Sequence, residues 1–245
     1  MHFSALQHVK DYKPPTEGQH IRILLHGPVG AGKSSFINSV QSVLRGRIYR
    51  QALADNVEST STSFTRKFRT YKIPKEGGQS FYPFVLNDMM GLEIRDGVLV
   101  DDVKLALRGH VRDGYKFNPE SKLSEDDPFY NKNPSTNDKV HVLVLVIDAN
   151  TMSMISDESV QRFRDIRMEA RDLGENRILF VFSVFLIDRA VYDPDVVLVS
   201  IQQSLPVAVC NFMMRETAAV FMSLIVCFIL FSCRNSSSGH FHQNR

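Results

Sequence analysis

The chain is poor in cysteine, in net charge and in apolar residues near its start, and each scarcity excludes a class of protein. Its formal net charge of +2 over 245 residues is too small to indicate a nucleic-acid-binding surface. The three cysteines, Cys210, Cys227 and Cys233, lack metal-ligand spacing, and their odd number gives no disulfide framework. A reducing compartment is therefore the simpler inference. Residues 1–20 also lack the apolar core of a secretory signal peptide.

The overall composition is that of an ordinary globular protein, with 43% hydrophobic and 23% charged residues. A chain of this length can hold one α/β domain with a full core. We expect a lead-in segment over residues 1–20, one domain over 21–188, and a divergent segment over 189–245. Beyond residue 188 no clear alternation of strands and helices is visible.

A phosphate-binding loop is the most informative feature. The pattern GxxxxGK[ST] is matched without a mismatch from Gly27 to Ser34. A short apolar run over 21–25 precedes it and predicts a buried parallel strand. Apolar residues at helical spacing over 34–44 follow it, and Gly46 can end that helix. A strand, a glycine-rich bend and a helix together form a cradle for phosphate.

The residue types explain the chemistry expected of this loop. Glycines let the backbone wrap closely around an anion, and successive amides and the helix N-terminus then face the phosphate oxygens. Lys33 is expected to reach the β- and γ-phosphates, and the Ser34 hydroxyl to bind Mg²⁺. The alternative, a chance glycine-rich turn, does not account for the flanking strand and helix.

A second nucleotide motif, DxxG, runs from Asp88 to Gly91 at the end of the apolar run 84–87. P-loop proteins place there the carboxylate that holds Mg²⁺, usually through water. In GTPases a threonine from the preceding loop completes the metal shell. Thr60, Thr62 and Thr65 are the candidates, and we choose Thr62 because it lies just before a predicted strand.

These motifs define the predicted site. Its metal ligands are Ser34, Thr62 and Asp88, while no residue is assigned a catalytic role. The predicted nucleotide-binding residues are Gly27, Pro28, Val29, Gly30, Ala31, Gly32, Lys33, Ser34, Ser35, Asp88 and Gly91.

The remaining patterns predict further elements. Two strands over 64–73 and 81–86, joined by a short turn, indicate an antiparallel hairpin. Proline-rich residues 113–139 indicate a long surface insertion. Helices are expected over 98–107 and 157–173, and Ser156 can cap the second of them. Strands are expected over 140–147 and 177–187.

The uncharged run over 217–233 has about the minimum length for crossing a bilayer as a helix. A membrane tail anchor, a buried helix and an artefact of the coding sequence all remain open for it.

With these motifs in view, the chain resembles the interferon-induced protein 44 and 44-like family. The resemblance covers about residues 10–174 and rests on the segments 24–40, 64–71, 87–93, 146–150 and 164–167. It implies a P-loop GTPase-like α/β fold, a three-layer sandwich with a mostly parallel sheet that is incomplete at its C-terminal end. It also implies GTP or GDP with Mg²⁺ as ligands, a cytoplasmic location, and a role in interferon-linked antiviral defence.

Two departures from the GTPase pattern leave the activity open. The guanine-reading motif [NT]KxD is reduced to its aspartate, Asp188. Directly after Gly91 stand Leu92 and Glu93, where many small GTPases have a glutamine that orients water. Three hypotheses follow: a guanine-nucleotide switch with slow or no hydrolysis, a non-hydrolysing scaffold in the immune response, or an ATP-binding P-loop protein. In each case the protein would act through an unidentified protein partner or through self-assembly.

Overall fold

The computed structural model describes residues 2–14, 16–48, 52, 67–89, 91–92, 97–148, 154–173 and 177–183. Within these ranges the chain forms a sheet with strand order β2-β3-β1-β4-β5. The strands are β1 (Ile21–His26), β2 (Arg69–Pro74), β3 (Phe81–Asp88), β4 (Val142–Asp148) and β5 (Arg177–Ser183). The helices are α1 (His2–Asp11), α2 (Lys33–Arg45), α4 (Val100–Arg108) and α5 (Asp157–Asp172).

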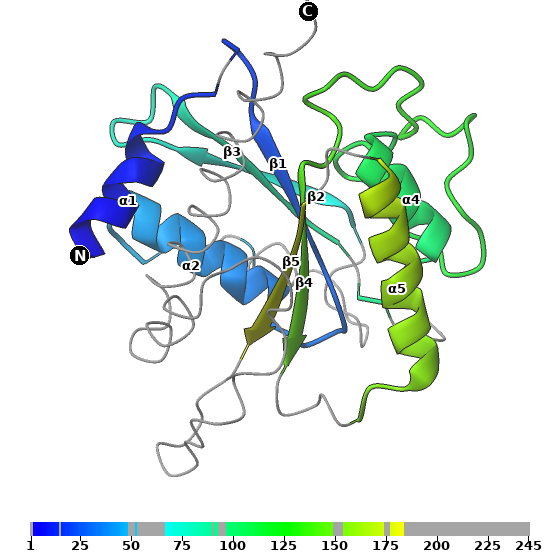
Figure 1. Cartoon of the computed structure of the whole chain (residues 1–245). Helices are drawn as coiled ribbons and strands as arrows, with labels where there is room; N and C mark the ends of the chain where they lie inside the picture. The colour runs from blue at the N-terminus through cyan, green and yellow to red at the C-terminus, as the bar shows by residue number, and fades with distance from the viewer. Residues whose placement is uncertain are drawn as a thin grey trace, which may run out of the picture.

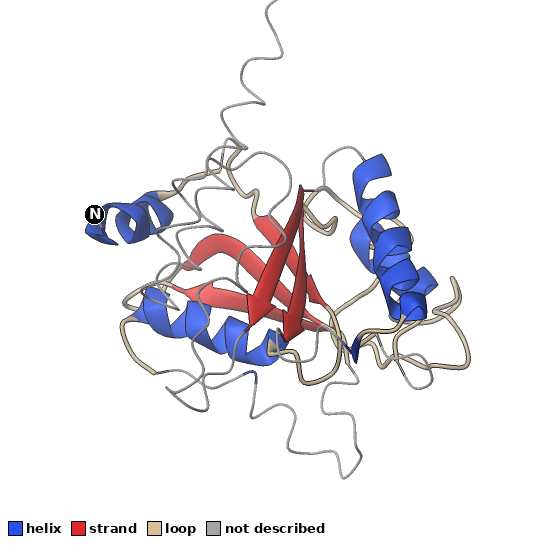
Figure 2. Cartoon of the chain, turned by 60° about the horizontal axis from the view of Figure 1, so that its bottom comes forward, coloured by secondary structure: helices blue, strands red, loops and turns tan. Residues whose placement is uncertain are grey.

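Figure 1 shows three layers, with α1 and α2 on one face of the sheet and α4 and α5 on the other, and Figure 2 shows the same arrangement from below. β1 pairs in parallel with β3 and β4, and β4 pairs in parallel with β5. Only β2 runs antiparallel, in the predicted hairpin with β3. This is the α/β, mostly parallel, three-layer architecture of a P-loop NTPase, as the sequence predicted.

Alternation along the strands separates the two halves of the core, because successive side chains point to opposite faces. Ile23 and Leu25 of β1 face the α1/α2 side, whereas Leu24 faces the α4/α5 side. On the α1/α2 side the buried apolar residues are Val9, Tyr12, Ile37, Val40, Leu44, Tyr71, Ile73, Phe84, Leu86, Val142, Val144 and Val146, with others around them.

The N-terminal helix α1 is a feature that the sequence analysis missed. Residues 1–20 were expected to be only a lead-in, yet Val9 and Tyr12 are buried in the core, and the Tyr12 ring stacks on Phe84 at 5.4 Å. Lys10 also forms an ion pair with Glu76, Nζ to Oε1 at 3.2 Å. The first helix therefore belongs to the packed domain.

The start of β2 differs from the predicted strand over 64–73. Phe68 precedes β2 and pairs with the insertion, donating its N–H to Tyr115 O and accepting from Gly114 N, both at 2.8 Å. Thr70 N–H donates to Asp113 Oδ1 at 2.7 Å. The insertion thereby covers the beginning of an edge strand whose amides would otherwise be unpaired.

The insertion over 113–139 lies between α4 and β4, and it is anchored more deeply than a surface loop. Tyr115, Phe117 and Leu123 are buried against α4. The fully buried Asp102 accepts the Leu123 N–H at 2.8 Å, and burial raises the pKa of this carboxyl. A buried polar anchor on α4 thus holds the middle of the insertion.

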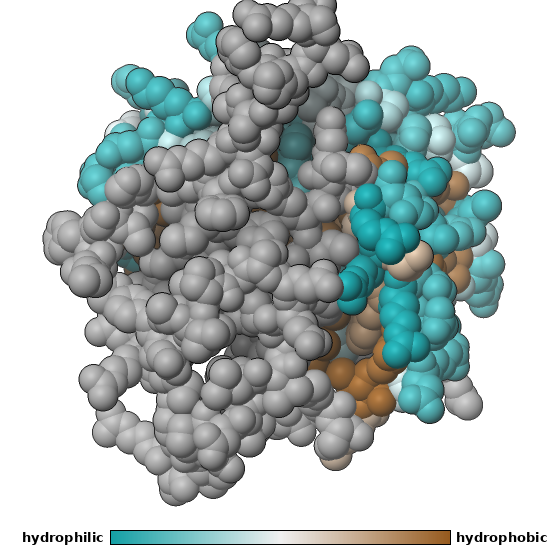
Figure 3. Space-filling view, in the orientation of Figure 1, coloured by the Kyte–Doolittle hydropathy of each residue, from teal (hydrophilic) through white to brown (hydrophobic). Residues whose placement is uncertain are grey.

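The predicted start of α5 is confirmed. Ser156 adopts an extended conformation and accepts the Ser159 N–H at 3.2 Å, as an N-cap does. Phe163, Ile166 and Ala170 form its buried face. Away from that face Arg162 pairs with Glu158. In Figure 3 the side of the molecule that carries α4 and α5 shows many hydrophilic residues, with hydrophobic patches between them.

Candidate functional site: the phosphate loop

The predicted phosphate loop connects the C-terminal end of β1 to the N-terminus of α2. β1 ends at His26 and α2 begins at Lys33, so the loop occupies residues 27–32. The helix starts at once, with Phe36 N–H donating to Gly32 O at 2.8 Å. The N-terminus of α2 therefore faces the loop, where its dipole favours an anion.

Glycine is required at position 27 both by the packing of the loop against β4 and by the bend of the chain after β1. Its φ is 136°, and a Cβ built at this position would lie 2.0 Å from the carbonyl oxygen of Val146 on β4. Only glycine lets the chain leave β1 this close to the neighbouring strand. The loop is therefore held against the sheet at its first residue.

Lys33 points into the loop. Its side chain is only 7% exposed, and Nζ donates to Gly27 O at 3.1 Å and to Pro28 O at 2.8 Å. A buried ammonium is costly unless it is hydrogen-bonded, and these two carbonyls meet that need. The positive charge of Lys33 therefore lies beside the first two residues of the loop.

Ser34 and Asp88, two of the predicted metal ligands, are in direct contact. Ser34 Oγ donates to Asp88 Oδ2 at 2.7 Å, and Met89 N–H donates to Asp88 Oδ1 at 3.0 Å. Asp88 is the last residue of β3 and is fully buried. Burial raises the pKa of its carboxyl, while Lys33 and the two hydrogen bonds oppose that rise.

The residues after Asp88 pack directly on the phosphate loop. Leu92 N–H donates to Gly27 O at 3.2 Å, and Val98 N–H donates to Gly91 O at 3.0 Å. A Cβ at Gly91 would lie 2.5 Å from Val29 Cγ2. The two sequence motifs, 54 residues apart at Ser34 and Asp88, are therefore parts of one site.

His26 is a site neighbour that the sequence analysis missed. His26 is 2% exposed, its Nδ1 has no hydrogen-bond partner among the described residues, and its ring meets Phe163 of α5 edge-on at 6.1 Å. Burial, with a smaller effect of Lys33, lowers its pKa to about 3. The available signal was a titratable residue ending an otherwise apolar strand, directly before the glycine bend.

The structure brings together most of the predicted site. Residues 27–35, Asp88 and Gly91 meet at the C-terminal ends of β1 and β3, with Ser35 in the first turn of α2. Thr62, the alternatives Thr60 and Thr65, and Asp188 lie outside the described residues.

The donor set suits Mg²⁺ held with the help of a nucleotide. Among the described residues, no group of three or more His, Cys, Asp or Glu side chains could hold a metal ion alone. Mg²⁺ is commonly bound by one or two protein oxygens together with water and substrate phosphates. Ser34 Oγ and the Asp88 carboxylate offer that arrangement beside the phosphate cradle.

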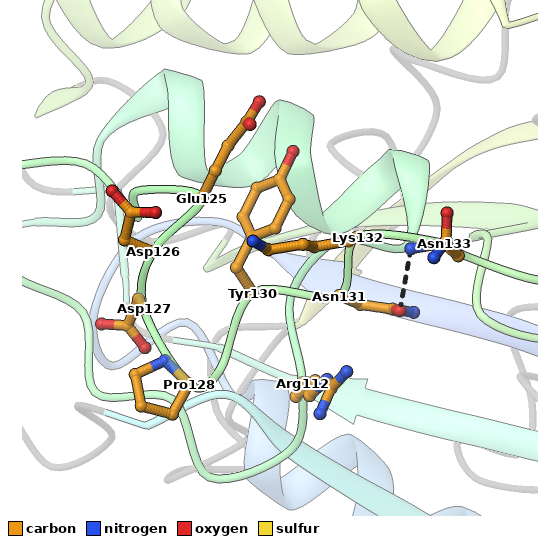
Figure 4. A pocket seen from close by; sticks show the side chains of 9 residues that line it. All are labelled: Arg112, Glu125, Asp126, Asp127, Pro128, Tyr130, Asn131, Lys132 and Asn133. Carbon is orange, nitrogen blue, oxygen red and sulfur yellow. Dashed lines mark hydrogen bonds between the residues drawn. The ribbon is translucent and has the colours of Figure 1, made fainter.

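A second charged concavity lies in the insertion, away from the phosphate loop. This charged hollow has a volume of about 570 Å³ and is shown in Figure 4. It is lined by Arg112, Glu125, Asp126, Asp127, Pro128, Tyr130, Asn131, Lys132 and Asn133. It shares no residue with the predicted site, and charges of both signs surround it.

No helix in the described part of the chain is long and apolar enough to cross a membrane. The apolar run over 217–233 lies outside that part, so the tail-anchor hypothesis stays a prediction.

The solved structures that match this chain resemble it only weakly. A bacterial selenocysteine-specific elongation factor EF-Sec matches with a TM-score of 0.28 and 11% identity, over 68% of this chain and 26% of that one. The SRb-GTP/SRX complex of the signal recognition particle receptor from Chaetomium thermophilum matches with a TM-score of 0.33 and 13% identity, over 91% of this chain and 86% of that one. No family model matches the chain.

Comparison with curated proteins is more informative. Interferon-induced protein 44 from Mus musculus is 38% identical over 77% of this chain and 43% of its own length. The Homo sapiens protein of the same name is 36% identical over 76% and 41%, and human interferon-induced protein 44-like is 33% identical over 69% and 37%. The chain thus spans about two fifths of the length of these relatives. Over the part that matches, it belongs to the interferon-induced protein 44 and 44-like family.

Proposed function

We propose that this protein binds GTP with Mg²⁺ through residues 27–35, Asp88 and Gly91, and turns it over slowly or not at all. The observation that supports this most strongly is the hydrogen bond from Ser34 to Asp88, beside an inward-pointing Lys33. These groups bring one hydroxyl, one carboxylate and one ammonium to the end of a glycine loop. That combination has little structural purpose unless a polyanion and a divalent cation bind there.

Each group has a definite task when the nucleotide binds. Lys33 is already held across the loop by Gly27 O and Pro28 O, so its charge is positioned before the phosphates arrive. Bound Mg²⁺ would supply the positive charge that neutralises the phosphate oxygens. Ser34 and Asp88 would then exchange their mutual hydrogen bond for contacts to the metal and its water.

The proposed setting is the interferon-induced immune or antiviral response, in the cytoplasm. Only the interferon-induced part of this setting comes from the names of the curated relatives, of which this chain spans about two fifths. In this setting the bound nucleotide would control a protein partner or self-assembly.

Binding and turnover are measured separately in one experiment on the full chain. Labelled GTP and ATP are titrated with Mg²⁺, and phosphate release is then assayed. Tight GTP binding with measurable release supports a switch, whereas GTP binding without release supports the scaffold hypothesis. A preference for ATP supports the third hypothesis. Failure of both nucleotides to bind would contradict the proposed function.

A further inference from the structure

We infer that Asn87 is a positioning residue for Asp88, and that it links this carboxylate to the insertion over 113–139. Asn87 is the middle member of a polar row, which consists of Arg22 on β1, Asn87 on β3 and Thr70 on β2. No member of the row belongs to either nucleotide motif. The inference deepens the proposed function and rests on it, because Asp88 is the carboxylate expected to serve the metal.

The polar row crosses the sheet on its α4/α5 face, toward which Leu24, two residues after Arg22, also points. Arg22 Nη1 donates to Asn87 Oδ1 at 3.1 Å, and Asn87 Nδ2 donates to Thr70 Oγ1 at 2.8 Å. Asn87 is fully buried and lies opposite Thr70 in the pairing of β2 with β3. The two ends of its amide group are therefore held by two different neighbouring strands.

Both ends of the polar row are tied to the insertion. At one end, Thr70 N–H donates to Asp113 Oδ1 at 2.7 Å. At the other end, Arg22 Nε donates to Asn137 O at 2.9 Å. Asn137 is held in turn, because its Oδ1 accepts the His20 N–H at 3.1 Å. The first residue of the insertion and a residue near its end thus hold the row from two sides.

The polar row and the phosphate loop meet at the same strand end from opposite faces. Successive side chains of a strand point to opposite faces, so Asn87 points toward the α4/α5 side and Asp88 toward α2. There Asp88 Oδ2 accepts the Ser34 hydroxyl at 2.7 Å, and Asp88 is the last residue of β3. Holding the Asn87 side chain therefore fixes the backbone from which the Asp88 carboxylate extends.

Packing alone does not explain polar side chains at these positions. Apolar side chains of similar size would fill the same space, and replacing a buried polar network by apolar groups is often neutral or stabilising. A buried network whose members are all hydrogen-bonded does, however, restrict its surroundings to one arrangement. At the end of β3 that arrangement includes the position of Asp88 beside Ser34.

The test uses Thr70→Val in the full-length chain, which keeps the shape of the side chain and removes the acceptor for Asn87. The gain in GTP affinity that Mg²⁺ provides, measured against EDTA, should fall by roughly fivefold, the scale of one hydrogen bond. GTP affinity in EDTA should stay the same. In the nucleotide-free protein, the Met89 amide, which donates to Asp88 Oδ1 at 3.0 Å, should exchange its hydrogen faster.

Three further variants control the test. Thr70→Ser keeps the hydroxyl and should leave both properties as they are in the unchanged protein. Thr136→Val makes the same chemical change at an exposed position of the insertion and should alter neither property. Asp113→Ala removes the exposed carboxylate at one end of the row and should change both properties in the same direction as Thr70→Val, by a smaller factor. Thermal unfolding checks that each variant folds, and Asp113→Ala carries the test if Thr70→Val does not.

Failure of the inference differs from failure of the proposed function. If the unchanged protein does not bind GTP, or gains no affinity from Mg²⁺, both fall. If it binds GTP with a gain from Mg²⁺, and the folded variant keeps either that gain or the exchange rate of the Met89 amide, only the inference is overturned.

Discussion

The phosphate loop and the charged hollow both gather ionisable side chains, but they differ in burial. At the loop, Lys33, Asp88 and His26 are 7%, 0% and 2% exposed. At the hollow, Arg112, Glu125, Asp126 and Lys132 are exposed, and none of them forms an ion pair among the described residues. Burying charge is costly, whereas exposed charge is nearly free.

The difference shows where a ligand is to be expected. Hydrogen bonds within the loop hold the buried Lys33 and Asp88 side chains in place, and in the proposed function a nucleotide with Mg²⁺ would offer both groups further partners. The exposed charges of the hollow need no such partner, since water solvates them.

The largest expected contrast is in nucleotide binding. Lys33→Ala should weaken GTP affinity about 100-fold, because it removes a preorganised charge-assisted contact to phosphate. The matched change Lys132→Ala at the hollow should leave affinity within about twofold, because that ammonium is exposed. Equilibrium titration of both variants with labelled GTP measures the contrast. Equal affinities of the two variants would show that the loop is not the binding site.

The second contrast concerns the metal. Asp88→Asn keeps the size of the side chain and removes its charge, so it should reduce the gain in GTP affinity that Mg²⁺ provides by about tenfold or more. Asp126→Asn at the hollow is the control and should have no effect. The measurement is GTP affinity as a function of Mg²⁺ concentration. An unchanged Mg²⁺ dependence in Asp88→Asn would remove this residue from the metal site.

The third prediction concerns stability in acid. Because burial holds the pKa of His26 at about 3, the folded state resists a proton that the unfolded chain accepts near pH 6.5. Stability should therefore fall as the pH drops below 6.5, by about 2 kcal/mol between pH 7 and pH 5. Chemical denaturation at several pH values across this range measures the free energy of unfolding. His26→Leu should flatten the profile, and an equally steep decline in that variant would assign the loss to other groups.

The smallest expected contrast is in stability, between a carboxyl group on α4 that anchors the insertion and an exposed one in the insertion itself. Asp102→Ala should cost about 1–3 kcal/mol of stability, because it leaves the buried Leu123 N–H without its acceptor. Glu125→Ala, on the exposed rim of the hollow, should stay within about 0.5 kcal/mol. Denaturant titration measures the free energy of unfolding of each variant. Similar losses for both would mean that the insertion is not anchored through Asp102.

Local patterns predicted those parts of the fold that local chemistry determines. The apolar run before the phosphate loop, the helix after it and the Ser156 cap each depend on neighbouring residues, and each appears where it was expected. The bounds are less predictable: β2 begins at Arg69 because Phe68 pairs with the insertion instead.

The missed features depend on contacts between distant segments. Helix α1 is short and weakly apolar, and it is held by the burial of Val9 and by the stacking of Tyr12, just after the helix, on Phe84 of β3. Likewise, the motifs predicted that Ser34 and Asp88 both serve a metal, but not that they bond to each other. The closeness of Val29 to Gly91 has no sequence signal beyond the two motifs, since it depends on how β3 lies beside β1.

Calorimetric titration of GTP into the unchanged protein, with Mg²⁺ and then with EDTA, tests most directly whether the loop binds a nucleotide together with a metal. We predict saturable one-to-one binding in Mg²⁺ and at least tenfold weaker binding when the metal is removed. Absence of binding in both conditions, or identical affinity in both, would contradict a site in which Ser34 and Asp88 hold a metal beside the phosphates.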